Sequence, residues 1–536
     1  MTWLLIRLES RVKSELMNLD DLVEGKQVIA VTCNQWGDSG KGKIVDFFAS
    51  WADLIVRGTG GDNAGHTIVL NDDKVIIHLI PSGILYDKEG KINIIGNGTV
   101  LNPQILVKEM NMLDKANYSY NNLLVSGEAS LIMPYHIILD QVKDRLKGKK
   151  KIGTTERGIG PSYTEKVFRD GIKINDLFNK QAFRKKLELN LKKETRTLKQ
   201  VYGLTEQELK EILSGEKFEK GIYFNNGDFD LDAIIGKYAE YGAKFKKHVA
   251  DTKLVVHESF LAGKKILLEG AQGLLLSVEH GTYPFVTSSD CSVNGLASGS
   301  GLPASEIDLS LGLVKTPYMT RVGNGPFPSE FGGRESEAYC ATGITVKDEL
   351  NKYGIPFKEV NGEARYDSRH PKIIELMNSD NELEKGIGVR LAGGEYGATT
   401  GRPRRTGWLD LIALKYAVGI NGKHIITTKS DVADPLTEIK LCVGYRFDGE
   451  PVFYNGLELK RNDLIDFFPT NSDILYQCKP VYQKLRGWKT NTSSLTEFAG
   501  LPEPMKAMIG FIEDFAGCKI AIVSTGPDRK QTIIRD

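Results

Sequence analysis

The chain has 536 residues, a formal net charge of +1, 41% hydrophobic residues and 26% charged residues. This composition is ordinary for a globular protein and excludes a disordered chain, a collagen-like chain and a small disulfide scaffold. The near-neutral charge argues against a protein whose main partner is nucleic acid or an anionic membrane surface. We therefore expect neither nucleic acid nor a membrane among its partners.

The six cysteines are scattered and form no C-x-x-C pair, so the sequence predicts neither a zinc motif nor a redox motif. Dispersed cysteines of this kind are typical of a reducing compartment. Residues 1–26 are predicted to form a polar, helical extension, whose acidic residues do not fit a signal or transit peptide. No apolar run approaches the roughly 18 residues of a membrane span. These features predict a cytoplasmic protein.

The first strong strand signal is Val28 to Val31, followed at once by a glycine-rich stretch and then by a helical pattern, IVDFFASWA. Strand, glycine-rich loop and helix is the order of a phosphate-binding unit. Further strand-like runs, separated in several places by helical stretches, occur at residues 54–57, 75–79, 92–95, 266–269, 425–428 and 520–524. This alternation predicts an α/β fold with a large, mostly parallel central sheet flanked by helices.

Two segments interrupt the alternation. Residues 171–262 contain charged amphipathic stretches and are predicted to form a helical subdomain, with lysines on solvated helix faces rather than in an anion-binding patch. Residues 331–394 are polar and charged, show little periodicity, and are predicted to be an insertion or subdomain. The sequence thus predicts one domain over residues 27–536 that carries helical and loop insertions.

The glycine-rich stretch Gly37–Lys43 reads GDSGKGK and satisfies the pattern G-x-x-x-x-G-K. Glycines allow backbone N–H groups to approach phosphate oxygens, and lysines add positive charge. The next residue is Ile44, where such loops usually place a hydroxyl that binds magnesium. Asp38 is therefore the nearest candidate metal ligand. The competing interpretation is a glycine-rich surface turn with solvated lysines.

Three further motifs lie in the first half of the chain. Gly60–Thr67 contains His66, a candidate general acid, although a lone histidine is more often structural. Gly153–Pro161 offers hydroxyls and backbone amides to a phosphate, or is a plain polar loop. In Glu269–Gly273, Gln272 follows a strand, and ligands of α/β sheets gather at the carboxyl ends of strands.

Three motifs follow in the second half. Gly397–Arg405 combines three arginines with two threonines, which suits capture of a carboxylate or phosphate, or else a subunit contact. Thr428–Asp431 reads TKSD after an apolar strand, and its carboxylate can accept hydrogen bonds from the ring N–H and amine of guanine. Ser524–Asp528 follows another apolar strand and is a candidate for the same base site.

In this order, the motifs closely resemble the adenylosuccinate synthetase family, from about Val28 to Asp536 and broken mainly at residues 331–394. The family hallmarks present are QWGDSGKGKIVD, NAGHT, IGTT-RGIGP, EGAQG, GTYPFVTSS, TRVGNGPFPSE, GATTGRPRRTGWLD, TKSD and STGPDR. The resemblance implies a site like that of P-loop NTPases for GTP and a GTP- and Mg²⁺-dependent ligation of IMP with L-aspartate. The implied product is adenylosuccinate, formed through 6-phosphoryl-IMP.

The resemblance also implies individual roles. Asp38 takes the N1 proton of IMP, His66 stabilises the transferring phosphoryl group, and Lys41 and Gln272 complete the catalytic set. Mg²⁺ is held by Asp38 and the backbone carbonyl of Gly65.

The implied substrate contacts form three sets. The GTP-binding residues are Gly37, Asp38, Ser39, Gly40, Lys41, Gly42, Lys43, Gly65, His66, Thr67, Arg404, Lys429, Ser430, Asp431, Ser524, Thr525 and Gly526. The IMP-binding residues are Asp38, Ser39, Gly40, Lys41, Asn63, Ala64, Gly65, His66, Thr155, Arg169, Gln272, Thr287 and Arg402. The aspartate-binding residues are Ala398, Thr399, Thr400, Gly401, Arg402, Pro403 and Arg404. Arg169 corresponds to an arginine that serves the neighbouring subunit, which implies a homodimer with shared sites.

The chain also departs from the family pattern. Ser39 stands where a glutamate is usual beside the catalytic aspartate, and Glu156 and Ser277 are further unusual residues. These changes leave open a (d)GMP-specific synthetase, like a viral branch of the family that replaces the catalytic aspartate with a small residue. Retention of Asp38 favours IMP. A GTP-binding regulator without catalysis is a third hypothesis, and the retained catalytic residues argue against it.

Overall fold

The computed structural model describes residues 19–70, 73–146, 154–213, 215, 218, 223–225, 228–360, 362–397 and 401–535. Of the predicted N-terminal extension, residues 1–18 lie outside these ranges, and the short helix α2 (Leu19–Val23) belongs to the remainder. None of the helices within the described ranges has both the length and the apolar character needed to cross a membrane.

A 10-stranded sheet forms the centre of the molecule, with β1 (Val28–Cys33) between β12 (Ile266–Glu269) and β13 (Leu309–Lys315). Its strand order is β11-β7-β5-β2-β12-β1-β13-β18-β24-β25. The remaining strands are β2 (Leu54–Arg57), β5 (Ile92–Ile95), β7 (Leu123–Ser126), β11 (Val249–Ala250), β18 (His424–Thr428), β24 (Lys519–Ser524) and β25 (Thr532–Ile534). Neighbouring strands are parallel except β24 and β25. The predicted mostly parallel α/β fold is confirmed.

The apolar run of β1 is buried on both faces of the sheet because successive side chains point in opposite directions. Ile29 and Val31 pack with α3 (Lys41–Ala49) on one face. Val28 and Ala30 pack on the other face with α10 (Thr252–Leu261) and α11 (Val293–Ser300). A strand covered on both faces reads as a continuous hydrophobic run, which explains its strong sequence signal.

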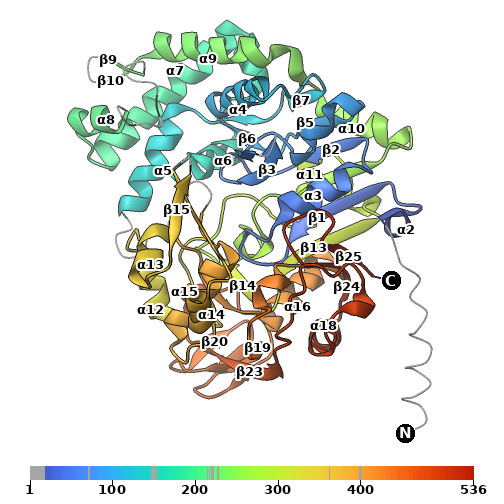
Figure 1. Ribbon diagram of the computed structural model, residues 1–536. Coiled ribbons are helices and arrows are strands. Elements are labelled where there is room, and N and C mark those ends of the chain that lie inside the picture. The colour runs from blue at the N-terminus through green and yellow to red at the C-terminus, as the bar shows by residue number, and fades with distance from the viewer. Residues whose placement is uncertain are drawn as a thin grey trace.

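A helical lobe lies at one end of the sheet, at the top of Figure 1. Its helices are α4 (Pro103–Lys115), α5 (Pro134–Leu146), α6 (Ile159–Phe168), α7 (Lys180–Arg196), α8 (Glu206–Leu213) and α9 (Leu231–Phe245). Within the predicted helical segment 171–262, β11 instead joins the edge of the main sheet and α10 covers one of its faces. The two-residue strand is too short to produce a periodic signal of its own.

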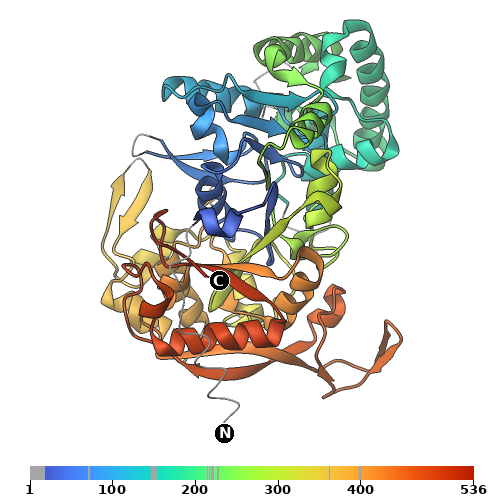
Figure 2. The ribbon, with the colours of Figure 1, turned by 90° about the vertical axis from the view of Figure 1, so that its right-hand side faces the viewer.

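A second lobe lies at the opposite end of Figure 1 and contains segment 331–394. The segment folds into α12 (Gly333–Cys340), α13 (Val346–Lys352), β15 (Phe357–Val360), β16 (Glu363–Tyr366), α14 (Pro371–Met377) and α15 (Glu382–Gly393). Figure 2 shows the β15–β16 hairpin projecting from this lobe. Most of its helices are short and bury only a few side chains each, so the sequence shows little periodicity.

The rest of this lobe is built from α16 (Leu411–Asn421), α17 (Ser472–Leu475), α18 (Glu503–Ala516), β19 (Glu438–Phe447), β22 (Leu464–Ile465) and β23 (Cys478–Arg486). Small strand pairs complete the fold: β3 (His66–Leu70) with β4 (Asp73–Ile77), β6 (Val100–Leu101) with β8 (Ser130–Leu131), β9 (Phe224–Asn225) with β10 (Asp228–Phe229), β14 (Tyr318–Arg321) with β17 (Arg405–Trp408), and β20 (Val452–Tyr454) with β21 (Leu457–Leu459). The run predicted at 75–79 therefore belongs largely to the β3–β4 hairpin and not to the central sheet.

Candidate nucleotide and active site

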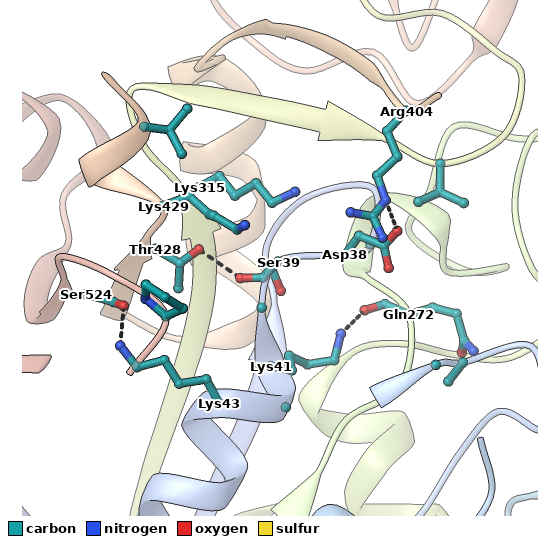
Figure 3. Close-up of a pocket in the computed structure, with 18 of the residues that line it drawn as sticks. Asp38, Ser39, Lys41, Lys43, Gln272, Lys315, Arg404, Thr428, Lys429 and Ser524 are labelled. Carbon is teal, nitrogen blue, oxygen red and sulfur yellow. Dashed lines mark hydrogen bonds and ion pairs between the residues drawn. The ribbon is translucent and has the colours of Figure 1, made fainter. Parts of the chain in front are cut away.

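A cavity of about 520 Å³ opens where β1, β12, β13, β18 and β24 end at the carboxyl edge of the sheet (Figure 3). Parallel strands bring the residues that follow them to one edge, so motifs distant in the chain meet there. The cavity is lined by Gly37, Asp38, Ser39, Gly40, Lys41, Gly42, Lys43, Asn63, Ala64, Gly65, Gln272, Leu276, Lys315, Val322, Ser368, Ala392, Arg404, Thr428, Lys429, Asp431, Val432, Ser524, Gly526 and Pro527.

The predicted phosphate-binding loop lies between β1 and α3 and lines this cavity. Gly40 precedes the first residue of α3 and has a φ of 86°, a left-handed conformation that glycine adopts without steric cost. The loop therefore leads directly into a helix N-terminus, whose N–H groups attract anions. The Lys41 Nζ atom donates a hydrogen bond of 2.5 Å to the carbonyl of Gln272. Backbone donors and a lysine thus meet on one wall.

Lys43 connects this loop to the predicted base-binding turn. Its Nζ atom donates to the Ser524 hydroxyl and the Gly526 carbonyl, each at 2.7 Å. Burial lowers the pKa of Lys43 to about 8, against the opposing effect of Asp431 and Asp528. An incoming anionic ligand would restore the ordinary preference of this lysine for its charged form.

The residues predicted to bind the base follow the end of β18 and line the same cavity. Lys429 has a φ of 61° and donates a 2.8 Å hydrogen bond to the Gly393 carbonyl. The Oδ1 atom of Asp431 is buried and has no hydrogen-bond partner among the described residues. Burial also raises the pKa of Asp431. A buried acceptor without a partner is costly, so a ligand that donates N–H groups would be stabilised here.

Not every predicted GTP contact turns its side chain to the cavity. The Ser430 hydroxyl lies 3.0 Å from the Thr316 hydroxyl, and Thr525 donates to the Leu495 carbonyl. Neither residue is among the described residues that line the cavity. Their side chains instead fix the loops that present Asp431 and Ser524.

Three predicted IMP-binding side chains meet beside the phosphate loop. Gln272 Nε2 donates to Asn63 Oδ1 at 2.8 Å, and Asn63 Nδ2 donates to the Thr287 hydroxyl at 3.3 Å. Asn63 and Gln272 are more than 200 positions apart in the chain. They meet because the strands that precede them end at the same edge of the sheet. The cluster provides both donors and acceptors, as a purine nucleotide requires.

A chain of charged groups crosses the cavity. Arg404 contacts Asp38 through Nε, with 2.5 Å to Oδ2, and Glu395 through Nη1, with 2.8 Å to Oε2 (Figure 3 labels Asp38 and Arg404). Glu395 also binds the Nζ atom of buried Lys315 at 2.7 Å. Burial lowers the pKa of Lys315 to about 8. Burial alone would raise the pKa of Glu395, but the positive charges of Lys315 and Arg404 outweigh it and hold that pKa below its usual value. Arg404 is thereby directed at the predicted catalytic carboxylate.

Sequence reasoning missed Lys315, Glu395 and Ser368. Lys315 is the charged last residue of a largely apolar strand. Its position at the carboxyl end of a strand is the same feature that pointed to Gln272 and could have identified Lys315. Glu395 precedes the motif Gly397–Arg405 by two positions and carries no pattern of its own. Ser368 comes from segment 331–394, and its approach to the cavity depends on how that segment packs.

Other predicted residues lie away from the described cavity lining. Thr155 and Arg169 are exposed, and Arg169 ends α6 in a left-handed conformation with a φ of 68°. Gly401, Arg402 and Pro403 also lie outside the lining. The remaining predicted positions, Ala398, Thr399, Thr400 and the side chains of His66 and Thr67, fall outside the part of the chain that the structure describes.

A phosphate loop at a helix N-terminus, with a buried carboxylate placed for base recognition at the carboxyl edge of a parallel sheet, defines a nucleotide-binding α/β enzyme. The chain matches the sequence model of adenylosuccinate synthetase over residues 30–533. It is 40% identical to the adenylosuccinate synthetase of Halothermothrix orenii, across 96% of this chain and 99% of that protein. It is 38% identical to that of Caldicellulosiruptor bescii, across 95% of this chain and 100% of that protein.

A solved structure of fully ligated adenylosuccinate synthetase from Plasmodium falciparum superimposes with a TM-score of 0.73 at 32% identity, and the match covers 95% of this chain and 100% of that chain. The chain therefore belongs to the adenylosuccinate synthetase family. It is a ligase of purine nucleotide biosynthesis, which confirms the resemblance drawn from the motifs.

Proposed function

We propose that this ligase joins IMP and L-aspartate at the expense of GTP, releasing adenylosuccinate, GDP and phosphate. The observation that carries the proposal is one cavity that holds a glycine-rich loop at a helix N-terminus, the Asp431 carboxylate, whose Oδ1 atom has no hydrogen-bond partner among the described residues, and, against its edge, the Asn63–Gln272–Thr287 cluster. The distance between the motifs in the chain makes a chance arrangement of this kind implausible.

The chemistry requires activation of the purine. The 6-oxo group of IMP is a poor leaving group, so O6 first attacks the γ-phosphorus of GTP while Asp38 accepts the N1 proton. Lys41 and the loop N–H groups stabilise charge on the phosphoryl oxygens. The family resemblance assigns His66 the same stabilising role. The aspartate amine then attacks C6, the C6–O bond breaks, and phosphate leaves with the electron pair.

The ion pair between Arg404 and Asp38 suggests that the nucleotide binds before Asp38 accepts the N1 proton. Arg404 Nε lies 2.5 Å from Asp38 Oδ2, so one oxygen of this carboxylate is engaged in an ion pair. A triphosphate in the cavity offers Arg404 competing anionic oxygens. Nucleotide binding would therefore release Asp38 for the N1 proton, so that the base becomes available only when the phosphoryl donor is present.

The residues also fit magnesium. The described part of the chain contains no cluster of three or more His, Cys, Asp or Glu residues that could hold a metal. Mg²⁺ commonly uses only one or two protein carboxylates together with substrate phosphates. Asp38 and the carbonyl of Gly65 both border the cavity beside the phosphate loop and provide such a sparse oxygen set. The bound ion would neutralise phosphate charge during transfer.

The aspartate substrate is assigned to the loop 398–404, whose arginines suit its two carboxylates. A homodimer is proposed in which Arg169 serves the neighbouring IMP site. In support, the exposed Arg169 follows two large hydrophobic side chains, Val167 and Phe168, which are 80% and 66% exposed. Exposed apolar groups beside an arginine are typical of subunit contacts. All six cysteines are free, which supports the proposed cytoplasmic location.

Mass spectrometry of the product tests the function. The purified chain receives GTP, Mg²⁺ and aspartate, with IMP, dIMP, GMP or dGMP in separate reactions. Adenylosuccinate from IMP is the expected result. Product from GMP or dGMP alone would overturn the IMP assignment. It would indicate that Ser39 helps the site to accept a 2-amino purine. Absence of product from every nucleotide, with GTP still bound, would indicate a non-catalytic GTP-binding protein.

A further inference from the structure

Segment 331–394 ends just before the loop 397–404. Residues 395–397 and 402–404 lie side by side at the base of this loop, and we call this pair of short segments the neck. The neck is closed by backbone contacts on both sides. The Arg404 N–H donates to the Glu395 carbonyl at 2.9 Å, and the Gly397 N–H donates to the Arg402 carbonyl at 2.8 Å. Tyr396 and Pro403 face each other in the same narrow pairing. The geometry of this neck decides where the side chain of Arg404 points.

One side of the neck is held by α13. The Tyr396 hydroxyl donates a hydrogen bond to Oε2 of Glu349, whose side chain is fully buried. Glu349 lies 47 positions earlier in the chain, so the contact depends on the packing of the segment and not on local sequence. A buried carboxylate needs such donors, since leaving it unsatisfied would be costly.

The other side of the neck is held by α15. Arg390 Nη2 binds Glu349 Oε1 at 2.6 Å, and Arg390 Nη1 donates to the Arg404 carbonyl at 3.1 Å. The Arg390 side chain is also fully buried. A single buried ion pair thus reaches both sides of the neck, Tyr396 through the carboxylate and Arg404 through the guanidinium.

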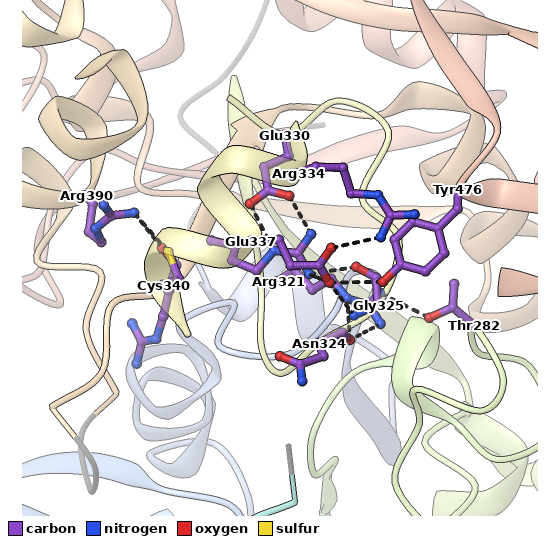
Figure 4. A network of polar contacts seen from close by, with 12 residues as sticks. Thr282, Arg321, Asn324, Gly325, Glu330, Arg334, Glu337, Cys340, Arg390 and Tyr476 are labelled. Atoms are coloured by element: carbon purple, nitrogen blue, oxygen red, sulfur yellow. Dashed lines mark hydrogen bonds and ion pairs between the residues drawn. The ribbon is translucent and has the colours of Figure 1, made fainter. Parts of the chain in front are cut away.

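A second network fixes the residue that follows the neck (Figure 4). Arg405 binds Glu330 through Nε at 2.9 Å, and its Nη1 atom lies 3.2 Å from Oε1 of Glu337 in α12. Figure 4 also shows Arg390 beside Cys340, at 3.7 Å from its sulfur. Position 405 is therefore anchored independently of the Glu349–Arg390 pair, and the pair governs positions 396 and 404.

Stability alone does not explain this arrangement. Buried ion pairs pay a large desolvation cost and are often replaceable by apolar residues without loss of stability. Here the hydrogen bonds that satisfy the pair are made to the two sides of a loop neck. From that neck, Arg404 extends to Asp38 and Glu395.

We propose that the Glu349–Arg390 pair is a positioning device for the neck of the loop 397–404, holding this neck so that Arg404 is directed onto Asp38, beside the substrate of the loop. Glu349, Arg390 and Tyr396 are positioning residues and touch no reacting atom. The identity of that substrate, aspartate, rests on the proposed function. The mechanical role of the pair does not.

The test compares Tyr396→Phe with Tyr366→Phe. Tyr366 donates its hydroxyl to the Leu391 carbonyl of the same helix α15 at 2.8 Å, so its variant removes a similar bond without touching the neck. We expect Tyr396→Phe to raise KM for aspartate about tenfold, leave KM for GTP within about twofold, and speed hydrogen exchange at the amides of Gly397, Gly401 and Arg404. Tyr366→Phe should change none of these.

Arg390→Lys provides a second variant, since it keeps the charge but loses the fork that reaches both Glu349 and the Arg404 carbonyl. It should show the same selective change in KM for aspartate and in exchange at the neck. Wild-type values of KM and of amide exchange in Tyr396→Phe would overturn the proposal, as would equal changes in Tyr366→Phe. Hydrogen exchange is measured without turnover, so this outcome is distinguishable from a failure of wild-type protein to make adenylosuccinate.

Discussion

The phosphate-loop side and the segment-331–394 side of the cavity are built in different ways. The phosphate loop, Gln272 and Asp431 each directly follow a strand of the central sheet, and the sheet alone brings them together. Ser368, Glu395 and the neck of loop 397–404 depend on short helices and on buried ion pairs. The central sheet therefore builds the first side, while long-range packing of side chains builds the second side.

This difference suggests two kinds of residue, those proposed to contact the ligand and those proposed to position other side chains. Residues at strand ends line the cavity and are proposed to act directly on the ligand, so their replacement should change catalysis or recognition strongly. Residues contributed by segment 331–394 act mainly by placing other groups, so single changes there should have smaller, selective effects. Four predictions test this division, in order of decreasing effect.

The largest effect is expected for Asp38→Asn, which removes the proposed proton acceptor. Turnover should fall about a thousandfold, because general-base catalysis contributes ~10²–10⁴. Binding of GTP, measured by calorimetry, should remain within about threefold. Asp46→Asn is a matched control, because Asp46 also pairs with an arginine, Arg529 at 2.7 Å, on the outer part of α3. A loss of turnover as large in the control would show that Asp38 acts only through folding.

Asp431→Asn should weaken GTP selectively. The loss of a charged acceptor for two N–H groups is expected to raise KM for GTP ~10–100-fold, since hydrogen bonds to charged groups contribute about 1.5–3 kcal/mol. The asparagine amide can donate to the 2-oxo group of xanthine, so xanthosine triphosphate should become the better phosphoryl donor. Steady-state rates with both triphosphates check this. An unchanged preference for GTP would place the base elsewhere.

The affinity for GTP should fall above pH 8. Burial lowers the pKa of Lys43 to about 8 in the ligand-free protein, whereas bound phosphates favour its charged form. Binding above pH 8 must therefore take up a proton, and the dissociation constant should rise by up to about tenfold per pH unit. Calorimetry between pH 7 and 9.5 measures this slope. Lys43→Arg, which does not titrate in this range, should give a flat profile, and a flat wild-type profile would contradict the prediction.

The smallest effect is expected for Ser368→Ala, on the segment side of the cavity. A lost hydroxyl contact of about 1 kcal/mol should raise KM for GTP about fivefold and leave kcat and KM for IMP unchanged. Ser379→Ala is a suitable control, because Ser379 lies in the same segment and bonds Glu384 at 2.9 Å, outside the cavity lining. A change in kcat with Ser368→Ala would assign this serine a role beyond nucleotide contact.

The fold class, and the meeting of several motifs at one cavity, could be predicted from local patterns in the sequence. A strand buried on both faces is a continuous apolar run, and the glycines, lysines and carboxylates of Gly37–Lys43 and Thr428–Asp431 follow such runs directly. Because parallel strands align their carboxyl ends, local patterns were enough to predict that these motifs share one edge. The run at 75–79 overlaps strand β4, but it pairs with β3 in a separate hairpin, because an apolar strand run does not show which sheet it joins.

The pairing of the buried charged residues could not be predicted from the sequence, because it depends on contacts between distant segments. Lys315 and Glu395 are 80 positions apart, and Glu349 and Arg390 are 41 apart, with no motif linking either pair. Charged side chains are common in the sequence, and burial selects the few that must find partners. Packing of the short helices of segment 331–394 placed Glu349 against Arg390 and so tied that segment to the loop beside Asp38. Long-range packing, rather than any local pattern, therefore determines how Arg404 is positioned beside Asp38.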